Sequence, residues 1–160
     1  MSLLALDDYL LIKWLHIVSA TILFGTGIGT AFFFWSSRKA CDAACLFAAR
    51  TTVRADLLFT LPAVVIQPLT GVYLIGAGGL DPTDLWLAAS YGLYVLAGLC
   101  WLPVVWIQIQ MKRMLEAKVA GQAFDEARFG RLRRVWFALG WPAFGGLLIV
   151  FMLMVAKPNW

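Results

Sequence analysis

Four long apolar runs, separated by short polar segments, dominate the pattern of hydrophobic and polar positions along the chain. They cover about residues 9–35, 57–77, 85–110 and 135–156. Each run reaches the roughly 20 residues that an α-helix needs to cross the hydrocarbon core of a bilayer. The pattern predicts an all-α integral membrane protein, in which a single domain over residues 1–160 forms an antiparallel four-helix bundle.

Small and polar residues recur on one helical face of each run, and in lipid such faces are expected to turn inward. For most of these positions ordinary helix packing explains the pattern. The predicted inward faces are Tyr9, Ile12, Lys13, His16, Ser19, Ala20, Leu23, Gly27 and Thr30 in the first run; Asp56, Thr60, Ala63, Gln67, Thr70 and Gly71 in the second; Ser90, Tyr91, Tyr94, Gly98, Trp101 and Gln108 in the third; and Ala138, Trp141, Gly145 and Met152 in the fourth.

Basic residues gather in two of the three connecting segments, at 36–55 and 111–134, whereas GGLDPTD between the second and third runs has none. Because cytoplasmic loops carry the excess of Lys and Arg, this asymmetry predicts that both termini lie outside. The same residues are expected to contact anionic lipid at the cytoplasmic loops. The net charge of +4 is therefore a topology signal, and we expect no nucleic acid as a partner.

Both basic segments have helical spacing, so we expect helices that project into the cytoplasm and lie partly on the headgroups. Gly121 is expected to break the second of them. Cys41 and Cys45 are expected to be two small apolar residues of the first, on the reducing side of the membrane. Asp56, just inside the second run, is expected to neutralise Arg54 or Arg50.

The composition excludes a soluble domain, because 62% of the 160 residues are hydrophobic and only 14% are charged. No serine–histidine–acid set, HExxH motif or phosphate-binding loop is present in the sequence. The segment GTGIG lies inside an apolar run with no strand before it, so it does not indicate a nucleotide site. Gly25 and Gly29 instead form a GxxxG pattern, which is compatible with close helix contact and with a homo-oligomer.

His16 is the only histidine of the chain and lies about two turns inside the first run. An ionisable residue within a membrane span is a functional candidate. Imidazole can ligate haem iron or relay a proton near neutral pH. The alternative is a histidine that is only hydrogen-bonded to a neighbouring helix, and the residues alone leave these three interpretations open.

The depth of His16 in the membrane limits which residues can contact it. This depth follows from the position of His16 in its run, because a helix rises 1.5 Å per residue. His16 lies roughly 10 Å below the outer end of its run, and Met152, Tyr91, Thr70 and Tyr73 lie near that level. Met152 and His16 could form a His/Met haem b site, with Tyr91 and Tyr94 lining the pocket. A single histidine excludes a bis-histidine site within one chain, although two chains could share haem through two copies of His16.

The segments KWLHIVSATILFGTGI and ADLLFTLPAVVIQPLTGVYLI resemble an uncharacterised family of small bacterial four-helix integral membrane proteins. This resemblance covers essentially the whole chain and implies a multi-pass protein of the bacterial inner (cytoplasmic) membrane. It implies four helices and no particular activity.

A more distant resemblance is to the HemJ-type protoporphyrinogen oxidases and to the membrane domain of copper-resistance protein D. It is carried by K-x-L-H at Lys13, Leu15 and His16, by Pro62 or Pro68 with T-G at residues 70–71, and by the closing V-x-K-P at 155–158. It implies that His16 is an axial haem ligand. The oxidases' second histidine near the inner end of the first span has no counterpart in FFFWSSRK, so porphyrinogen oxidation itself is not implied.

Two classes of function follow from these observations. The first is a membrane protein that binds haem b through His16, in an electron-transfer or oxidoreductase role with a redox partner. The second is a non-enzymatic small transporter or membrane assembly partner, whose polar interior only packs helices.

Overall fold

The computed structural model describes residues 3–158, and these residues form helices joined by short connections. In chain order the elements are α1 (Leu3–Ser36), the 3-10 turn η1 (Ser37–Lys39), α2 (Asp42–Ala55), the π-helix η2 (Asp56–Thr60), α3 (Leu61–Gly78), α4 (Leu85–Val119) and α5 (Glu126–Ala156). The elements α2, η2 and α3 follow one another without a break. The described residues therefore contain 4 helices that are long and apolar enough to cross a membrane, which confirms the predicted all-α four-helix membrane fold.

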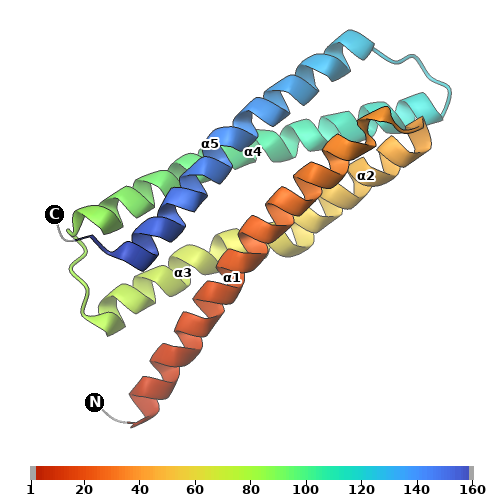
Figure 1. Ribbon diagram of the computed structural model, residues 1–160. Coiled ribbons are helices and arrows are strands. Elements are labelled where there is room, and N and C mark those ends of the chain that lie inside the picture. Colours follow the sequence, from red (N-terminus) through yellow and green to blue (C-terminus); the bar gives the residue numbers. More distant parts are fainter. Residues whose placement is uncertain (1–2, 159–160) are drawn as a thin grey trace.

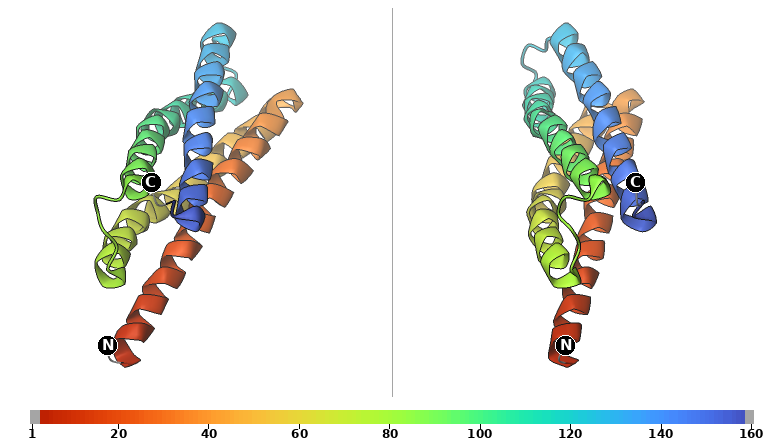
Figure 2. Two further views of the ribbon diagram at one scale, coloured as in Figure 1. Left: turned by 60° about the vertical axis from the view of Figure 1, so that its left-hand side comes forward. Right: turned by 90° about the vertical axis from the view of Figure 1, so that its left-hand side faces the viewer.

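The helices form two hairpins, one of α1 with α2–η2–α3 and one of α4 with α5 (Figure 1). The α1–α2 and α4–α5 connections meet at one end of the molecule, which we call the basic end. Both chain ends and the α3–α4 connection lie toward the other, which we call the terminal end. The first turns of α1 extend beyond the other helices at the terminal end (Figure 2). This arrangement is the predicted antiparallel order, and which end faces the cytoplasm stays a prediction.

At the basic end, α1, α2, α4 and α5 share a close-packed core. Met111 lies at its centre and has no exposed surface. Trp136 of α5 packs edge-on against Phe34 of α1, with ring centroids 5.4 Å apart. The other buried members of the core are Leu46, Ala48, Ala49, Ile107 and Leu115.

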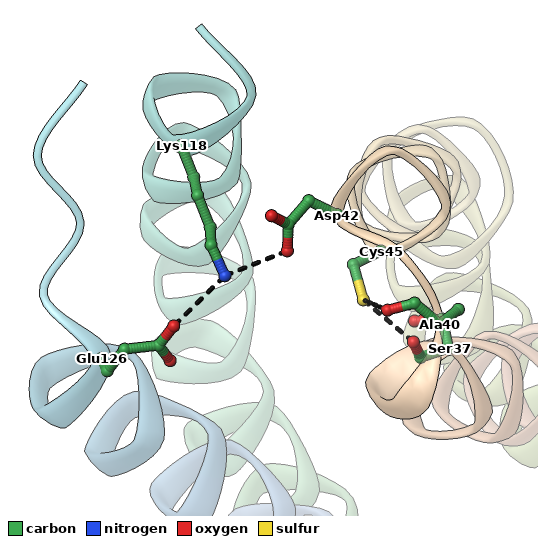
Figure 3. Close-up of polar contacts among 6 residues, drawn as sticks. All are labelled: Ser37, Ala40, Asp42, Cys45, Lys118 and Glu126. Carbon is green, nitrogen blue, oxygen red and sulfur yellow. Dashed lines mark hydrogen bonds and ion pairs between the residues drawn. The ribbon is translucent and has the colours of Figure 1, made fainter. Parts of the chain in front are cut away.

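Ion pairs close the same end. The Lys118 ammonium lies 3.0 Å from Asp42 of α2 and 3.2 Å from Glu126 of α5, so that one cation of α4 links three helices (Figure 3). Arg50 pairs with Glu116 at 3.0 Å. The Cys45 thiol donates to the Ser37 carbonyl at 2.9 Å, so this side chain fastens α2 to η1 (Figure 3).

The extension of the second hairpin at the basic end breaks where the sequence predicts. Gly121 adopts a φ of +75° just after α4 ends, a conformation that costs glycine little and other residues more. Asp125 then caps α5 by accepting a hydrogen bond from the Arg128 amide at 2.8 Å. The chain thereby reverses direction over a few residues.

The α3–α4 connection is held by Asp81, which accepts hydrogen bonds from the Thr83 amide at 2.8 Å and from its hydroxyl at 2.7 Å. These two bonds to the charged form hold the pKa of the exposed Asp81 carboxyl below its ordinary value.

Two prolines shape the second membrane helix. Proline has no N–H, so Pro62 cannot donate to the Leu58 carbonyl, and the preceding turn is the π-helix η2, in which the Leu61 amide bonds to the Asp56 carbonyl. Pro68 in the same way leaves the Val64 carbonyl without its helical donor. The Tyr94 hydroxyl of α4 supplies a donor to that carbonyl at 2.7 Å, so a proline defect becomes a contact between hairpins.

The predicted inward face of the second membrane helix is confirmed, because five of its six positions are buried. They are Asp56, Thr60, Ala63, Gln67 and Thr70.

The expected neutralisation of Asp56 by Arg54 or Arg50 is wrong. The Asp56 side chain is buried and accepts a hydrogen bond from Thr60 at 2.9 Å, whereas Arg50 pairs with Glu116 and Arg54 is exposed. Residues two apart on a helix point to nearly opposite sides, which separates Asp56 from Arg54.

The predicted inward face of the fourth membrane helix is not the face that packs in the core, although Trp141 and Gly145 of that face line a cavity between the hairpins. Trp141 is 70% exposed and Met152 is 69% exposed. The buried positions of α5 lie on nearly the opposite side of the helix and are Trp136, Gly146, Leu147 and Val150. The glycines of the GxxxG pattern, Gly25 and Gly29, are likewise exposed, with open space where a Cβ would lie.

Candidate functional site

His16 lies in a short row of polar side chains between α1 and α3, toward the terminal end. We call this row the polar seam and define it as His16 and Ser19 of α1 with Gln67 and Thr70 of α3. Ser19, Gln67 and Thr70 are all less than 9% exposed, and His16 is half-buried. The seam is formed because the inward faces predicted for the first two runs do meet in the structure.

Gln67 fastens the seam to the backbone of α1. Its amide nitrogen donates to the His16 carbonyl at 2.8 Å and to the Ser19 hydroxyl at 3.0 Å. Ser19 in turn donates to the His16 carbonyl at 3.1 Å. Because three hydrogen bonds converge on this turn, the main chain at His16 is held at a fixed height against α3.

Thr70 orients the imidazole ring. The Thr70 hydroxyl donates along its own helix, with the Ile66 carbonyl at 2.7 Å and the Gln67 carbonyl at 3.1 Å. Its oxygen lies 2.7 Å from Nδ1 of His16. A hydroxyl has one hydrogen, so with that hydrogen on the helix the oxygen accepts from Nδ1–H; we assign this tautomer from the hydrogen-bond network.

The assigned tautomer leaves Nε2 of His16 with a lone pair. No hydrogen-bond partner for Nε2 occurs among residues 8–158. A Cβ at Gly71 would lie 3.6 Å from the Cε1 carbon of the ring, so glycine leaves extra room on the α3 side of the ring. A ring fixed through Nδ1 with its Nε2 available is the usual arrangement of a histidine that ligates a metal.

The other predicted site residues are not gathered around His16. Met152 faces away from the bundle, as described above, so the argument for a His/Met pair within one chain is lost. Tyr91 is 38% exposed on α4. Tyr94 is half-buried, and its hydroxyl is bonded to Val64, on the basic side of the seam. Of the two residues noted at the level of His16 on the second run, Thr70 contacts it and Tyr73 is 44% exposed.

The described part of the chain contains no group of three His, Cys, Asp or Glu side chains that could hold a metal ion. A haem iron needs only one or two protein ligands, so a single histidine with a fixed tautomer is compatible with haem.

A second polar site was missed by reasoning from the sequence. Asp56 and Thr60 of η2 and Gln108 of α4 line one large cavity between the hairpins, and no residue of the polar seam is among its lining residues. The sequence does indicate it, since Asp56 is an acid at the edge of an apolar run. Asp56 was instead expected to form an ion pair with a neighbouring arginine.

Comparison with known proteins gives one family. No curated protein and no solved structure matches the chain. Residues 10–158 match the family described as "Predicted integral membrane protein (DUF2269)", in agreement with the resemblance to an uncharacterised membrane family. Since the match covers nearly the whole sequence, the chain belongs to the DUF2269 family of integral membrane proteins.

Proposed function

We propose that this protein binds haem b through Nε2 of His16 and serves as an electron-transfer component of the bacterial inner membrane. The observation that carries the proposal is the 2.7 Å contact between Nδ1 of His16 and the Thr70 hydroxyl. This contact fixes the ring and leaves the second nitrogen for iron, as outer-shell partners of ligating histidines do.

In this proposal the chain supplies one ligand to the haem. His16 would supply the axial nitrogen, and Thr70 and Gln67 would hold the ring and its main chain in place. Gly71 would leave room beside the ring. Haem iron would supply one-electron chemistry, whose potential depends on the axial ligands and on the apolar surroundings. A second copy of the chain or a redox partner could supply a further ligand.

The absorption spectrum of the purified protein tests the proposal. With haem supplied during expression, the protein should show a Soret band, and His16→Ala should abolish it. A colourless wild-type protein, or a band that survives His16→Ala, contradicts haem ligation by His16.

A matched pair of threonine variants tests the role of Thr70. Thr70→Val should lower haem occupancy by about 10-fold, the usual scale for losing an outer-shell partner. Thr21→Val should not, because the exposed Thr21 bonds only to its own helix, at the Ile17 carbonyl. Equal spectra for the two variants would show that Thr70 does not orient a ligating ring.

The second candidate function is a small transporter or membrane assembly partner without a redox cofactor. The observation that favours it is the cavity beside Asp56, with a volume of about 490 Å³. A colourless protein that binds a ligand in this cavity would support this candidate over the first.

A further inference from the structure

The large cavity lies between the two hairpins, and its most exposed lining residues belong to α1 and α5, among them Phe32 at 73% and Trp141 at 70%. These helices contact each other through two aromatic pairs, a stack of Trp35 on Phe137 with centroids 4.6 Å apart and an edge contact of Phe24 with Phe144 at 5.7 Å. All four rings line the cavity. Ile28 and Leu148, which also line it, are 50% and 55% exposed, so this side of the cavity is the one that faces the surroundings of the bundle. A molecule dissolved in the bilayer can therefore reach the cavity sideways, without crossing the aqueous phase.

The far wall of the cavity carries its polar groups. Asp56 and Thr60 come from η2, and Gln108 comes from α4. Their exposed fractions are 4%, 4% and 5%. The wall exists because Pro62 enforces the wide turn η2, and π-type turns of this kind are frequent at functional sites.

The polar wall carries a buried acid, Asp56, and the cavity lining also holds two buried N–H donors without acceptors in the described part of the chain, Nε1 of Trp101 and Nε1 of Trp136. Asp56 takes one bond from Thr60 at 2.9 Å, and no Lys, Arg or His side chain among residues 8–158 forms an ion pair with it. The Gln108 side chain is a second hydrogen-bonding neighbour of the Asp56 carboxyl, and its own Oε1 has no donor in the described part of the chain. Buried acceptors without donors are costly, so a bound group that brings positive N–H donors would stabilise the wall.

The rest of the lining complements the body of such a molecule. The volume of the cavity, about 490 Å³, falls in the range of roughly 300–1,000 Å³ that is usual for small-molecule sites. Aromatic faces, including Trp101 and Trp141, form much of the wall. Aromatic faces attract cations by about 0.5–2 kcal/mol each when water is excluded.

We propose that this cavity binds a protonated lipophilic amine taken from the bilayer, with its ammonium group on Asp56 and Gln108 and its apolar body among the aromatic side chains. The Asp56 carboxyl, which has no ion-pair partner among residues 8–158, selects a cation rather than a neutral lipid, and Gln108 Oε1 offers an acceptor for one of its N–H groups. The side of the cavity that faces the surroundings of the bundle selects a compound that partitions into membranes. The proposal does not rest on haem binding at His16.

Binding of diphenylpropylamine to the full chain in lipid nanodiscs tests the proposal, with empty nanodiscs as background. The neutral control is diphenylpropanol, which has the same carbon skeleton and a hydroxyl in place of the amine. Saturable binding of the tritiated amine is expected, with the alcohol competing at least about 10-fold more weakly, the scale of one charge-assisted hydrogen-bonded pair. No saturable binding, or equal affinity for amine and alcohol, overturns the proposal, and equal affinity would indicate a site for neutral lipids.

Variants locate the site. Asp56→Asn should weaken amine binding by at least about 10-fold and leave alcohol binding unchanged. Glu116→Gln, which removes an acid outside the cavity, should change neither. Gly140→Leu should weaken the binding of both compounds, because the added side chain would fill part of the cavity. The backbone can accept it, since a Cβ at this position meets only the Phe144 ring, at 4.0 Å. Unchanged amine binding in Asp56→Asn overturns the proposal.

Size-exclusion chromatography and circular dichroism decide whether Asp56→Asn is folded. If it is not, Gln108→Met keeps the experiment decisive, with an expected loss of about threefold or more for the amine alone. An unaltered affinity in folded Gln108→Met then overturns the proposal. The Soret band should be the same in every one of these variants, so a failure here is distinguishable from a failure of haem binding.

Discussion

The hydrogen bond from Tyr94 to the Val64 carbonyl should stabilise the protein only because Pro68 is present. Pro68 removes the N–H that would otherwise reach this carbonyl, and the Tyr94 hydroxyl replaces it at 2.7 Å. Tyr94→Phe removes the hydroxyl and keeps the ring. In the wild-type background it should leave the carbonyl without a donor, whereas in a Pro68→Ala background the backbone amide at position 68 can take its place.

The expected magnitude follows from the burial of the pair. Hydrogen bonds between transmembrane helices average about 0.6 kcal/mol and reach roughly 1.7 kcal/mol. An unpaired buried carbonyl costs about 1–3 kcal/mol, and Tyr94 is half-buried. Tyr94→Phe should therefore lower the free energy of unfolding by about 1–1.5 kcal/mol in the wild-type background, and by less than about 0.5 kcal/mol in the Pro68→Ala background.

A double-mutant cycle measures this coupling, using reversible unfolding of the purified protein in mixed micelles. The four proteins are wild type, the two single variants and the double variant, and the readout is helical circular dichroism. The reasoning predicts a coupling energy near 1 kcal/mol, above the roughly 0.3–0.5 kcal/mol scatter of independent sites. Additive effects within that scatter would refute the claim that Tyr94 compensates for the proline.

Three further predictions concern the basic end. Gly121→Ala should lower the free energy of unfolding by about 1 kcal/mol, since φ at this position is +75°; no change in micelle unfolding would mean that the turn relaxes. Lys118→Met should destabilise the protein at low ionic strength and progressively less at high salt, because this exposed ion-pair network is screened; a salt-independent loss would point to packing instead. With Cys45→Ser and Cys100→Ala in place, the exposed Cys41 should resist a membrane-impermeant maleimide in intact cells and react in inverted vesicles, and the opposite pattern would reverse the predicted orientation.

The buried face of the second membrane helix could be predicted from the sequence because its polar residues are few and fall on one side. In lipid every buried polar group needs a partner within the protein, so Gln67 and Thr70 had to turn inward. That constraint also brought Thr70 and His16 to one level. Gly121 was predictable for a related reason, since a glycine between two helical patterns marks a reversal of the chain.

The buried face of α5 could not be predicted in this way. Its membrane portion carries hardly any polar side chains, so the sequence offered only glycines and large apolar residues as guides. In lipid, a tryptophan or a methionine is stable on either side of a helix, because the solvent is itself apolar. The rotation of α5 is instead set by contacts such as that of Trp136 with Phe34, which depend on the placement of α1.

The prediction that a neighbouring arginine neutralises Asp56 failed for a different reason. Nearness along the chain suggested Arg54, but helical geometry separates positions two apart. The widening at η2 was also not predicted, although Pro62 is its cause, because a proline can equally produce a kink with water or a side chain in the gap. The cavity depends on this turn and on how far the two hairpins stand apart, and neither is readable from one sequence.

The two candidate sites should act independently, because they lie on one continuous helix at different depths. Thr70 follows Asp56 by 14 positions on α2–η2–α3, which corresponds to roughly 20 Å along the axis at 1.5 Å per residue. That distance is two thirds of the roughly 30 Å hydrocarbon core, so we expect the polar seam and the polar wall of the cavity to lie toward opposite leaflets. A cofactor at His16 could then exchange electrons near one surface while the cavity takes up its ligand from the other leaflet. His16→Ala should accordingly leave amine affinity unchanged, and a loss of affinity in that variant would show that the two hairpins move together.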